Sequence, residues 1–123
     1  MYLRVVRATI APGMTEAYWA WAKRILDLWD AAGVRRAGGP YAAKGSAGED
    51  VGVWLTLHET EAAMRDEFRR LYADGAGRDL IAERPPLVAH TTVESYPDWD
   101  QRGPGAPPSP PALQRFPGPP AEA

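Results

Sequence analysis

The sequence contains no cysteine, which excludes disulfide bonds, thiolate catalysis and cysteine-ligated metal centres. It contains only two histidines and no His-x-His or HExxH arrangement, so we expect no metal site. No apolar run approaches the roughly 18 residues needed to cross a bilayer, and no N-terminal stretch resembles a signal peptide. We therefore expect a cytoplasmic protein with no membrane partner.

A strong charge of either sign is also missing. Fourteen basic and sixteen acidic residues give a net charge of −2, and the basic pairs Arg35-Arg36 and Arg69-Arg70 stand alone. A nucleic-acid partner is therefore not expected. The 123 residues, 45% of them hydrophobic, indicate one globular domain. The abundance of Ala, Arg, Gly and Pro suits a bacterium with a GC-rich genome.

The C-terminal part of the chain has a different composition. Nine of its last 27 residues are proline, which favours extended polyproline II and cannot build a core. We therefore divide the chain into a domain, residues 1–96, and a proline-rich tail, residues 97–123. The tail is either disordered or docked on Trp19 and Leu26, which border the polar face of the first expected helix. Alternatively, these two residues belong to a wide buried face of that helix, which curls around a sheet edge.

Periodicity and turn residues predict the elements of the domain. The longest helix has a regular apolar face, with Thr15 as its expected cap and Gly33 at its C-terminal end. A second helix begins after Thr60, and a Gly-Gly-Pro segment interrupts the second strand, as expected of an edge strand. The expected strands are 2–10, 34–44, 51–58 and 87–96, and the expected helices are 16–32, 61–73 and 78–83.

The order of these elements is βαββαβ, with a short extra helix before the last strand. Right-handed crossovers then give an α+β fold of the ferredoxin-like type. We expect a four-stranded antiparallel sheet in the order 4-1-3-2, with both main helices on one face.

The third strand alternates clearly. Its odd positions from 51 to 57 are aliphatic, and its even positions carry Trp54, Thr56 and His58. We expect the aliphatic side to meet the helices, so that these three residues face away from them. An exposed tryptophan on a bare sheet needs a cover. A second copy of the sheet would supply it and enclose a ligand-sized interior.

Three motifs resemble the NIPSNAP-like group of small bacterial proteins within the dimeric α+β barrel superfamily. They are Ile10-Ala11-Pro12-Gly13 after the first strand, the Gly-Gly-Pro segment followed by Val51–His58, and Arg84-Pro85-Pro86-Leu87-Val88 before the last strand. The resemblance covers residues 1–96 and implies a homodimer paired through its sheet faces.

The superfamily includes cofactor-free oxygenases, isomerases, cyclases and haem-binding enzymes. The sequence departs from the group's pattern at Arg4-Val5-Val6, where an acidic-Leu-Arg segment is usual. It also departs at Thr56-Leu57-His58, where Trp-x-Tyr is usual, and at Gly77, where a tryptophan is usual. These changes lie largely on the expected ligand side.

The expected site lies on the Trp54 face. His58 would transfer protons near neutral pH, and Arg4 would stabilise negative charge. The alternative is that the inward-facing arginine of the first strand forms an ion pair with Glu94 on the last strand. Trp54 would stack on the ligand, beside Thr56. Further expected ligand contacts are Val6, Tyr41 and His90.

Two classes of function remain open. The first is a cofactor-independent enzyme of the oxygenase, isomerase or cyclase type, acting on an apolar aromatic or polyketide-like molecule. The second is a non-catalytic ligand-binding or structural homodimer. A histidine inside a closed, largely apolar cavity would favour the enzyme, and histidines that are solvated or locked to the backbone would favour the binder. The sequence does not identify the ligand, and no cofactor is expected.

Overall fold

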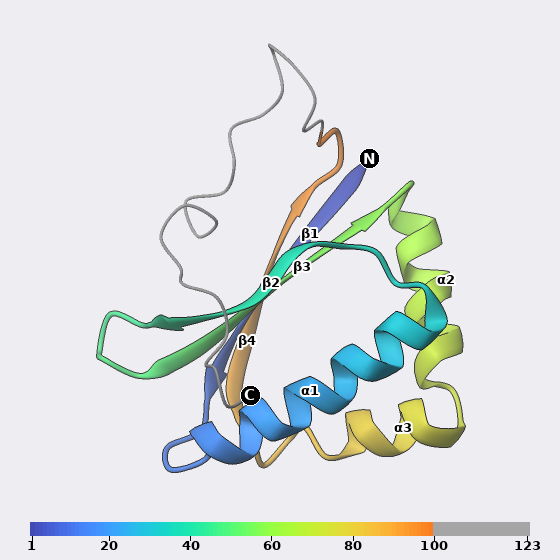
Figure 1. The fold of residues 1–123 in the computed structure, drawn as a ribbon. Helices are drawn as coiled ribbons and strands as arrows, with labels where there is room; N and C mark the ends of the chain where they lie inside the picture. The colour runs from blue at the N-terminus through green and yellow to red at the C-terminus, as the bar shows by residue number, and fades with distance from the viewer. Residues whose placement is uncertain (100–123) are drawn as a thin grey trace.

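A computed structural model describes residues 1–99, in which four strands and three helices form two layers (Figure 1). The elements follow one another in the predicted βαββαβ order, with α3 as the short extra helix. Their bounds are β1 (Tyr2–Ile10), α1 (Thr15–Ala32), β2 (Arg36–Lys44), β3 (Asp50–His58), α2 (Glu61–Tyr72), α3 (Gly75–Ala82) and β4 (Val88–Tyr96).

The sheet has the order β2-β3-β1-β4, and every neighbouring pair is antiparallel. This confirms the predicted order, read from the opposite edge. β2 is an edge strand, and its pairing with β3 shifts register between Arg36 and Tyr41. The Gly38-Gly39-Pro40 segment lies in this irregular stretch, at a sheet edge where proline's missing donor is tolerated.

The helix ends agree with the sequence at some points and differ at others. Gly33 closes α1 in the left-handed conformation, and the Thr60 hydroxyl accepts a hydrogen bond from the Ala63 amide at the start of α2. The prediction that Thr15 caps α1 was wrong, because its hydroxyl bonds Asp50 on β3 instead. α3 begins at Gly75 rather than at Arg78.

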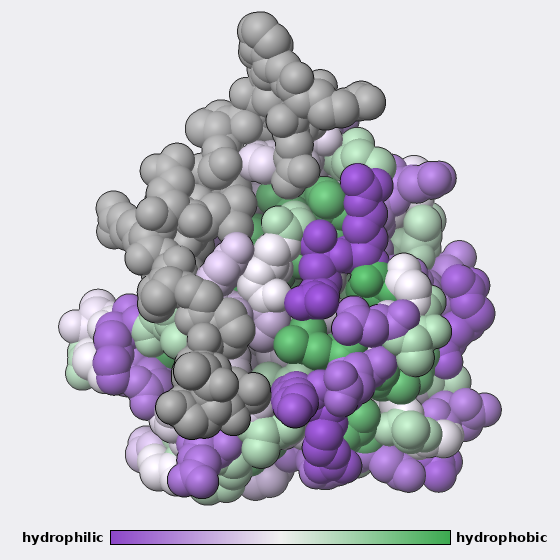
Figure 2. Space-filling model, viewed as in Figure 1, coloured by the Kyte–Doolittle hydropathy of each residue, from purple (hydrophilic) through white to green (hydrophobic). Residues whose placement is uncertain are grey.

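The helices cover one face of the sheet (Figure 1), and the core on that side is aromatic. It includes three tryptophans beneath or on α1, at positions 21, 29 and 54, together with Tyr18 and Ile25. The opposite face carries a separate aliphatic cluster from β1 and β3, formed by Leu3, Val5, Val51, Val53, Leu55 and Leu57. Figure 2 shows hydrophilic residues interspersed with hydrophobic ones on the visible surface of the helical layer.

The prediction that Trp54, Thr56 and His58 face away from the helices was therefore wrong. Alternation shows which side chains share a face, but it does not show which face the helices cover. The inner face of α1 is aromatic, and it packs on Trp54. Gly52 lies on the same side, where a Cβ would lie 2.5 Å from the Tyr18 hydroxyl, so the missing side chain lets α1 approach the sheet.

Two further residues bear on the sequence predictions. Trp19 is buried in the aromatic core, which supports a wide buried face for α1. Trp99 packs on the aliphatic cluster, and its amide donates a hydrogen bond to the Met1 carbonyl. The rest of the predicted tail, residues 100–123, lies outside the described residues. None of the described helices is long and apolar enough to cross a membrane.

Candidate functional site

A cavity of about 540 Å³ lies between the sheet and the helices. Its floor comes from β1, β3 and β4, and its walls come from all three helices. The lining residues are Arg4, Val6, Ala8, Tyr18, Trp21, Ile25, Trp29, Trp54, Met64, Arg65, Phe68, Arg69, Tyr72, Ile81, Arg84, Val88 and Thr91.

Aromatic rings make up much of the wall. The Trp54 ring meets those of Trp21 and Trp29 edge to face, with centroids 6.2 and 5.2 Å apart, and Phe68 stacks on Tyr72 at 5.9 Å. Such arrangements are favourable for aromatic pairs. The cavity therefore offers flat apolar surfaces to a ligand.

The three indole N–H groups of this wall are bonded inside the protein. Trp54 donates to the Tyr18 hydroxyl at 2.6 Å and Trp29 donates to the Tyr72 hydroxyl at 2.9 Å. Trp21 donates to the Leu80 carbonyl at 2.8 Å. The tryptophans are thus held in fixed orientations, with no indole donor left for a ligand.

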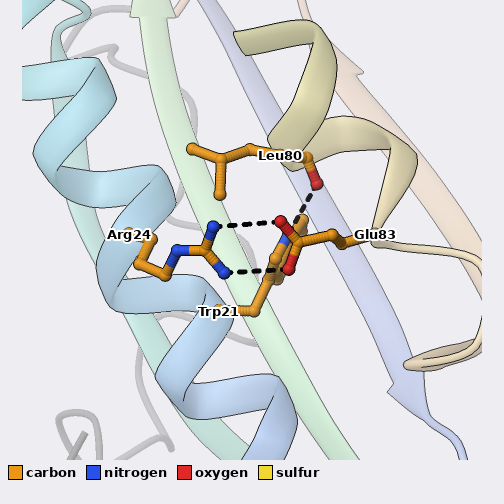
Figure 3. A network of polar contacts seen from close by, with 4 residues as sticks. All are labelled: Trp21, Arg24, Leu80 and Glu83. Atoms are coloured by element: carbon orange, nitrogen blue, oxygen red, sulfur yellow. Dashed lines mark hydrogen bonds and ion pairs between the residues drawn. The ribbon is translucent and has the colours of Figure 1, made fainter. Parts of the chain in front are cut away.

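α1 and α3 are joined beside the cavity (Figure 3). The hydrogen bond from Trp21 to the Leu80 carbonyl lies next to a bidentate ion pair, in which the Arg24 guanidinium contacts both carboxylate oxygens of Glu83 at 2.8 and 3.0 Å. Bidentate geometry fixes the orientation of the two groups as well as their distance. These contacts hold α3 in place, and with it the cavity residues Ile81 and Arg84.

Arg4 projects from β1 toward the helices. Its guanidinium lies over the Phe68 ring, 5.3 Å from the centroid, and among residues 1–99 it has no carboxylate partner. Burial lowers its pKa, and the nearby positive charge of Arg84 acts in the same direction. Arg7, its neighbour on the opposite face, pairs with Glu94 at 3.0 Å, which is the ion pair considered for this strand.

His58 is buried at the end of β3 and bonded on both sides of its ring. Nδ1 lies 3.0 Å from Glu67 Oε1 on α2, and Nε2 lies 2.8 Å from Thr56 Oγ1. Burial lowers the pKa of His58, against the opposing effect of Glu67, so the ring is neutral near pH 7. A neutral imidazole fits these contacts as a donor to Glu67 and an acceptor from Thr56.

The structure thus divides the predicted site residues into three groups. Arg4, Val6 and Trp54 line one cavity. Thr56 and His58 share their face of the sheet but do not line the cavity. Tyr41 and His90 lie on the opposite face, because they pair with Val53 and Thr9.

Sequence reasoning missed the helical half of the site. Tyr18, Phe68 and Tyr72 have no site role in the sequence-based predictions, and Arg84 appears there only within the motif that precedes the last strand. One signal was present: the inner face of α1 carries large aromatic residues at helical spacing, and aromatic side chains commonly line ligand pockets. Nothing in the sequence alone brings Arg84 to Arg4.

Comparisons with known proteins identify the fold. The structure is similar to that of an uncharacterized NIPSNAP domain protein from Burkholderia xenovorans, with a TM-score of 0.62 and 15% identity over 78% of this chain and 92% of that one. A NIPSNAP-like domain protein from the same organism gives 0.63 and 15% over 87% and 91%. A NIPSNAP family protein with unknown function from Agrobacterium tumefaciens gives 0.62 and 14% over 79% and 86%.

No protein-family model and no curated protein matches the sequence. The structural likeness, at about 15% identity, establishes a shared fold, and it confirms the βαββαβ architecture expected from the order of the elements. The matched proteins carry no described activity in their names, so function has to be argued from the cavity.

Proposed function

We propose that this protein binds a small, largely apolar molecule with an aromatic body, and that it does so as a homodimer. The observation that carries the proposal is the cavity of about 540 Å³ with tryptophan, tyrosine and phenylalanine walls. Ligand sites in proteins are mostly apolar, with a few fixed polar groups. The bonded indoles and the α1–α3 ion pair preorganise this one.

Binding is favoured over proton-transfer catalysis by the chemistry of the lining. The titratable lining residues are arginines and tyrosines, and burial raises the pKa of Tyr18 to about 12. His58, the expected base, does not line the cavity and has both ring nitrogens bonded to side chains. No described lining residue therefore accepts a proton near neutral pH.

The cofactor-independent enzyme keeps one supporting observation. Arg4 is a cation beside an apolar cavity, and such a group stabilises an enolate or phenolate formed there. Enzymatic activity would then depend on a substrate acidic enough to lose its proton to water or to a co-substrate. Turnover of a bound natural ligand by the purified protein would establish this second candidate.

The homodimer is proposed from the sheet face opposite the helices. That face has a continuous aliphatic cluster on the two central strands, and no helix of residues 1–99 covers it. The side chains of this cluster are already buried in the single chain, with Val5 and Val53 at 0% exposed, so a second copy would cover the exposed positions beside it, such as His90 and Thr92 on β4. The resemblance of the fold to the NIPSNAP-like group supports the proposal.

The cavity is tested by native mass spectrometry of the purified chain and by isothermal titration with aromatic probes such as 2-naphthalenemethanol. Met64→Trp puts an indole into the cavity from α2 and is expected to weaken probe binding. Ala62→Trp adds the same ring at an exposed position of α2 and is the matched control. Equal binding by both variants would contradict the cavity as the site.

The dimer is tested by light scattering at micromolar concentration. Thr92→Glu places a carboxylate at an exposed position of β4 on the face opposite the helices and is expected to give a monomer, because a charge enclosed between two paired faces is costly. Val93→Glu introduces the same carboxylate at the next residue, which is 51% exposed on the helix side of β4, and is the control. A monomeric unmodified chain would refute the dimer.

A further inference from the structure

Resting on the proposed binding function, we infer that the ligand is an acid: an aromatic carboxylate whose oxygens accept hydrogen bonds from Arg4 and from the Tyr72 hydroxyl. The inference concerns the polar part of the cavity, whereas the proposed function rests on its apolar walls. It names the substrate class that the same site selects.

The hydroxyls of Tyr18 and Tyr72 each accept one hydrogen bond inside the protein. Each hydroxyl oxygen accepts an indole N–H, from Trp54 for Tyr18 and from Trp29 for Tyr72. A phenol that accepts still has its own proton to donate. Among residues 1–99 neither hydroxyl has an acceptor for that proton. Tyr18 is completely buried, whereas Tyr72 is half-buried, so the Tyr72 hydroxyl is the one available to a ligand.

Those protons stay in place at neutral pH. Burial raises the pKa of Tyr18 to about 12 and also raises that of Tyr72. Tyr72 therefore acts as a donor toward the cavity. Together with Arg4, which has donors and no acceptor, it forms a polar pair that matches a ligand rich in acceptors.

The charged residues that line the cavity are all positive. Four arginines and no aspartate or glutamate line the cavity. Arg65 and Arg69 are paired on α2, with Glu61 and Asp66. Arg4 and Arg84 have no carboxylate partner among the described residues. Arg84 is exposed to solvent, whereas Arg4 is half-buried, so Arg4 is the positive charge that the cavity leaves without compensation.

A half-buried, unpaired guanidinium is costly unless something compensates it. Phe68 gives Arg4 a stacking surface, which leaves the in-plane N–H groups open for a planar acceptor. A carboxylate matches that fork in two parallel hydrogen bonds, and a neutral alcohol does not. This difference is the physical basis for selecting an acid.

The experiment compares two probes of the same shape on the full chain by isothermal titration calorimetry. 2-Naphthoate carries the carboxylate, and 2-naphthalenemethanol replaces it with a neutral hydroxymethyl group. We expect naphthoate to bind at least about tenfold more tightly, the effect of one charge-assisted hydrogen bond. Equal affinity for the two probes would overturn the inference and leave the proposed function standing, and binding of neither probe would overturn both.

Variants assign the selectivity to Arg4. Arg4→Met keeps a long apolar side chain and is expected to abolish the preference for naphthoate while retaining the affinity for the alcohol. Arg4→Lys keeps the charge without the fork and is expected to retain part of the preference. Arg70→Met removes an exposed charge of α2 outside the cavity and is the control.

Circular dichroism reports whether each variant folds, and the comparison of probes on the unmodified chain does not depend on any variant. A folded Arg4→Met that keeps the full preference would refute the role of Arg4. Loss of the preference in Arg70→Met to the same extent would indicate long-range charge rather than a bound acid.

Discussion

The hydrogen bond between Trp54 and Tyr18 allows a sharp test of how the cavity wall is held. Both residues are buried, Tyr18 completely, and the indole nitrogen lies 2.6 Å from the hydroxyl oxygen. Tyr18→Phe keeps the ring and its contacts with Trp19 and Trp21 but removes the acceptor. The indole N–H of Trp54 is then left buried without a partner.

An unsatisfied buried donor costs about 1–3 kcal/mol, which is the expected loss in the free energy of unfolding. For a chain of this size, each kcal/mol corresponds to roughly 4 °C in Tm. Urea denaturation and thermal melts at one fixed protein concentration measure both quantities, since the stability of a dimer depends on concentration. Tyr72→Phe is the matched control, because Tyr72 is only half-buried and water can replace its hydroxyl as the acceptor for Trp29.

A double-mutant cycle separates the hydrogen bond from other effects. In a Trp54→Phe background the donor is absent, so Tyr18→Phe is expected to cost little more. A loss below about 0.5 kcal/mol in the unmodified chain would lie within ordinary surface variation and would contradict the bond as a stabilising contact. The same loss in both backgrounds would show that the effect does not pass through Trp54.

Two further predictions concern His58 and Thr60. Because burial lowers the pKa of His58 in the folded chain, its contribution to stability is present above about pH 6.5 and is lost as the pH falls through the folded pKa, with a slope of at most about 1.4 kcal/mol per pH unit. His58→Gln should flatten the dependence of the unfolding free energy on pH between 7.5 and 5.5. His90→Gln changes an exposed position of the edge strand and should leave this dependence as it is. An unchanged slope in His58→Gln would contradict the role of His58. Thr60→Ala removes the side-chain cap of α2 and should destabilise the chain by about 1 kcal/mol in urea denaturation. Thr60→Ser keeps a hydroxyl and should retain most of the stability. No loss on Thr60→Ala would show that the start of α2 can fray without a cost to folding.

The local part of this protein could be predicted from its residues. All four strands and α1 were predicted nearly as observed. The signals were hydrophobic periodicity, turn-forming residues, and the glycines and prolines that end helices and strands, and these signals act over short stretches of chain. The Gly-Gly-Pro segment marked β2 as irregular and at an edge. The order of elements then gave the sheet order, because few crossovers are allowed.

The face on which some candidate residues lie could be predicted. The period of two on β1 puts Arg4 and Val6 on one face, since alternation is a property of each strand, and the register of β1 with β3 puts Trp54 beside Val6. Their role in binding a ligand stays a prediction. The positions of Tyr41 and His90 could not be read in this way. Tyr41 follows a break in register, and His90 shares a face with Thr9 only because of how β4 pairs with β1.

The side on which the helices lie was decided by tertiary packing alone. The aliphatic and aromatic faces of β3 are both hydrophobic, so burial by itself does not choose between them. The choice depends on complementarity with α1, whose tryptophans and Tyr18 interlock with Trp54 above Gly52. Sequence alternation determined which residues meet, and the packing of α1 determined that they meet beneath the helices, where Tyr18, Tyr72 and Arg84 join them.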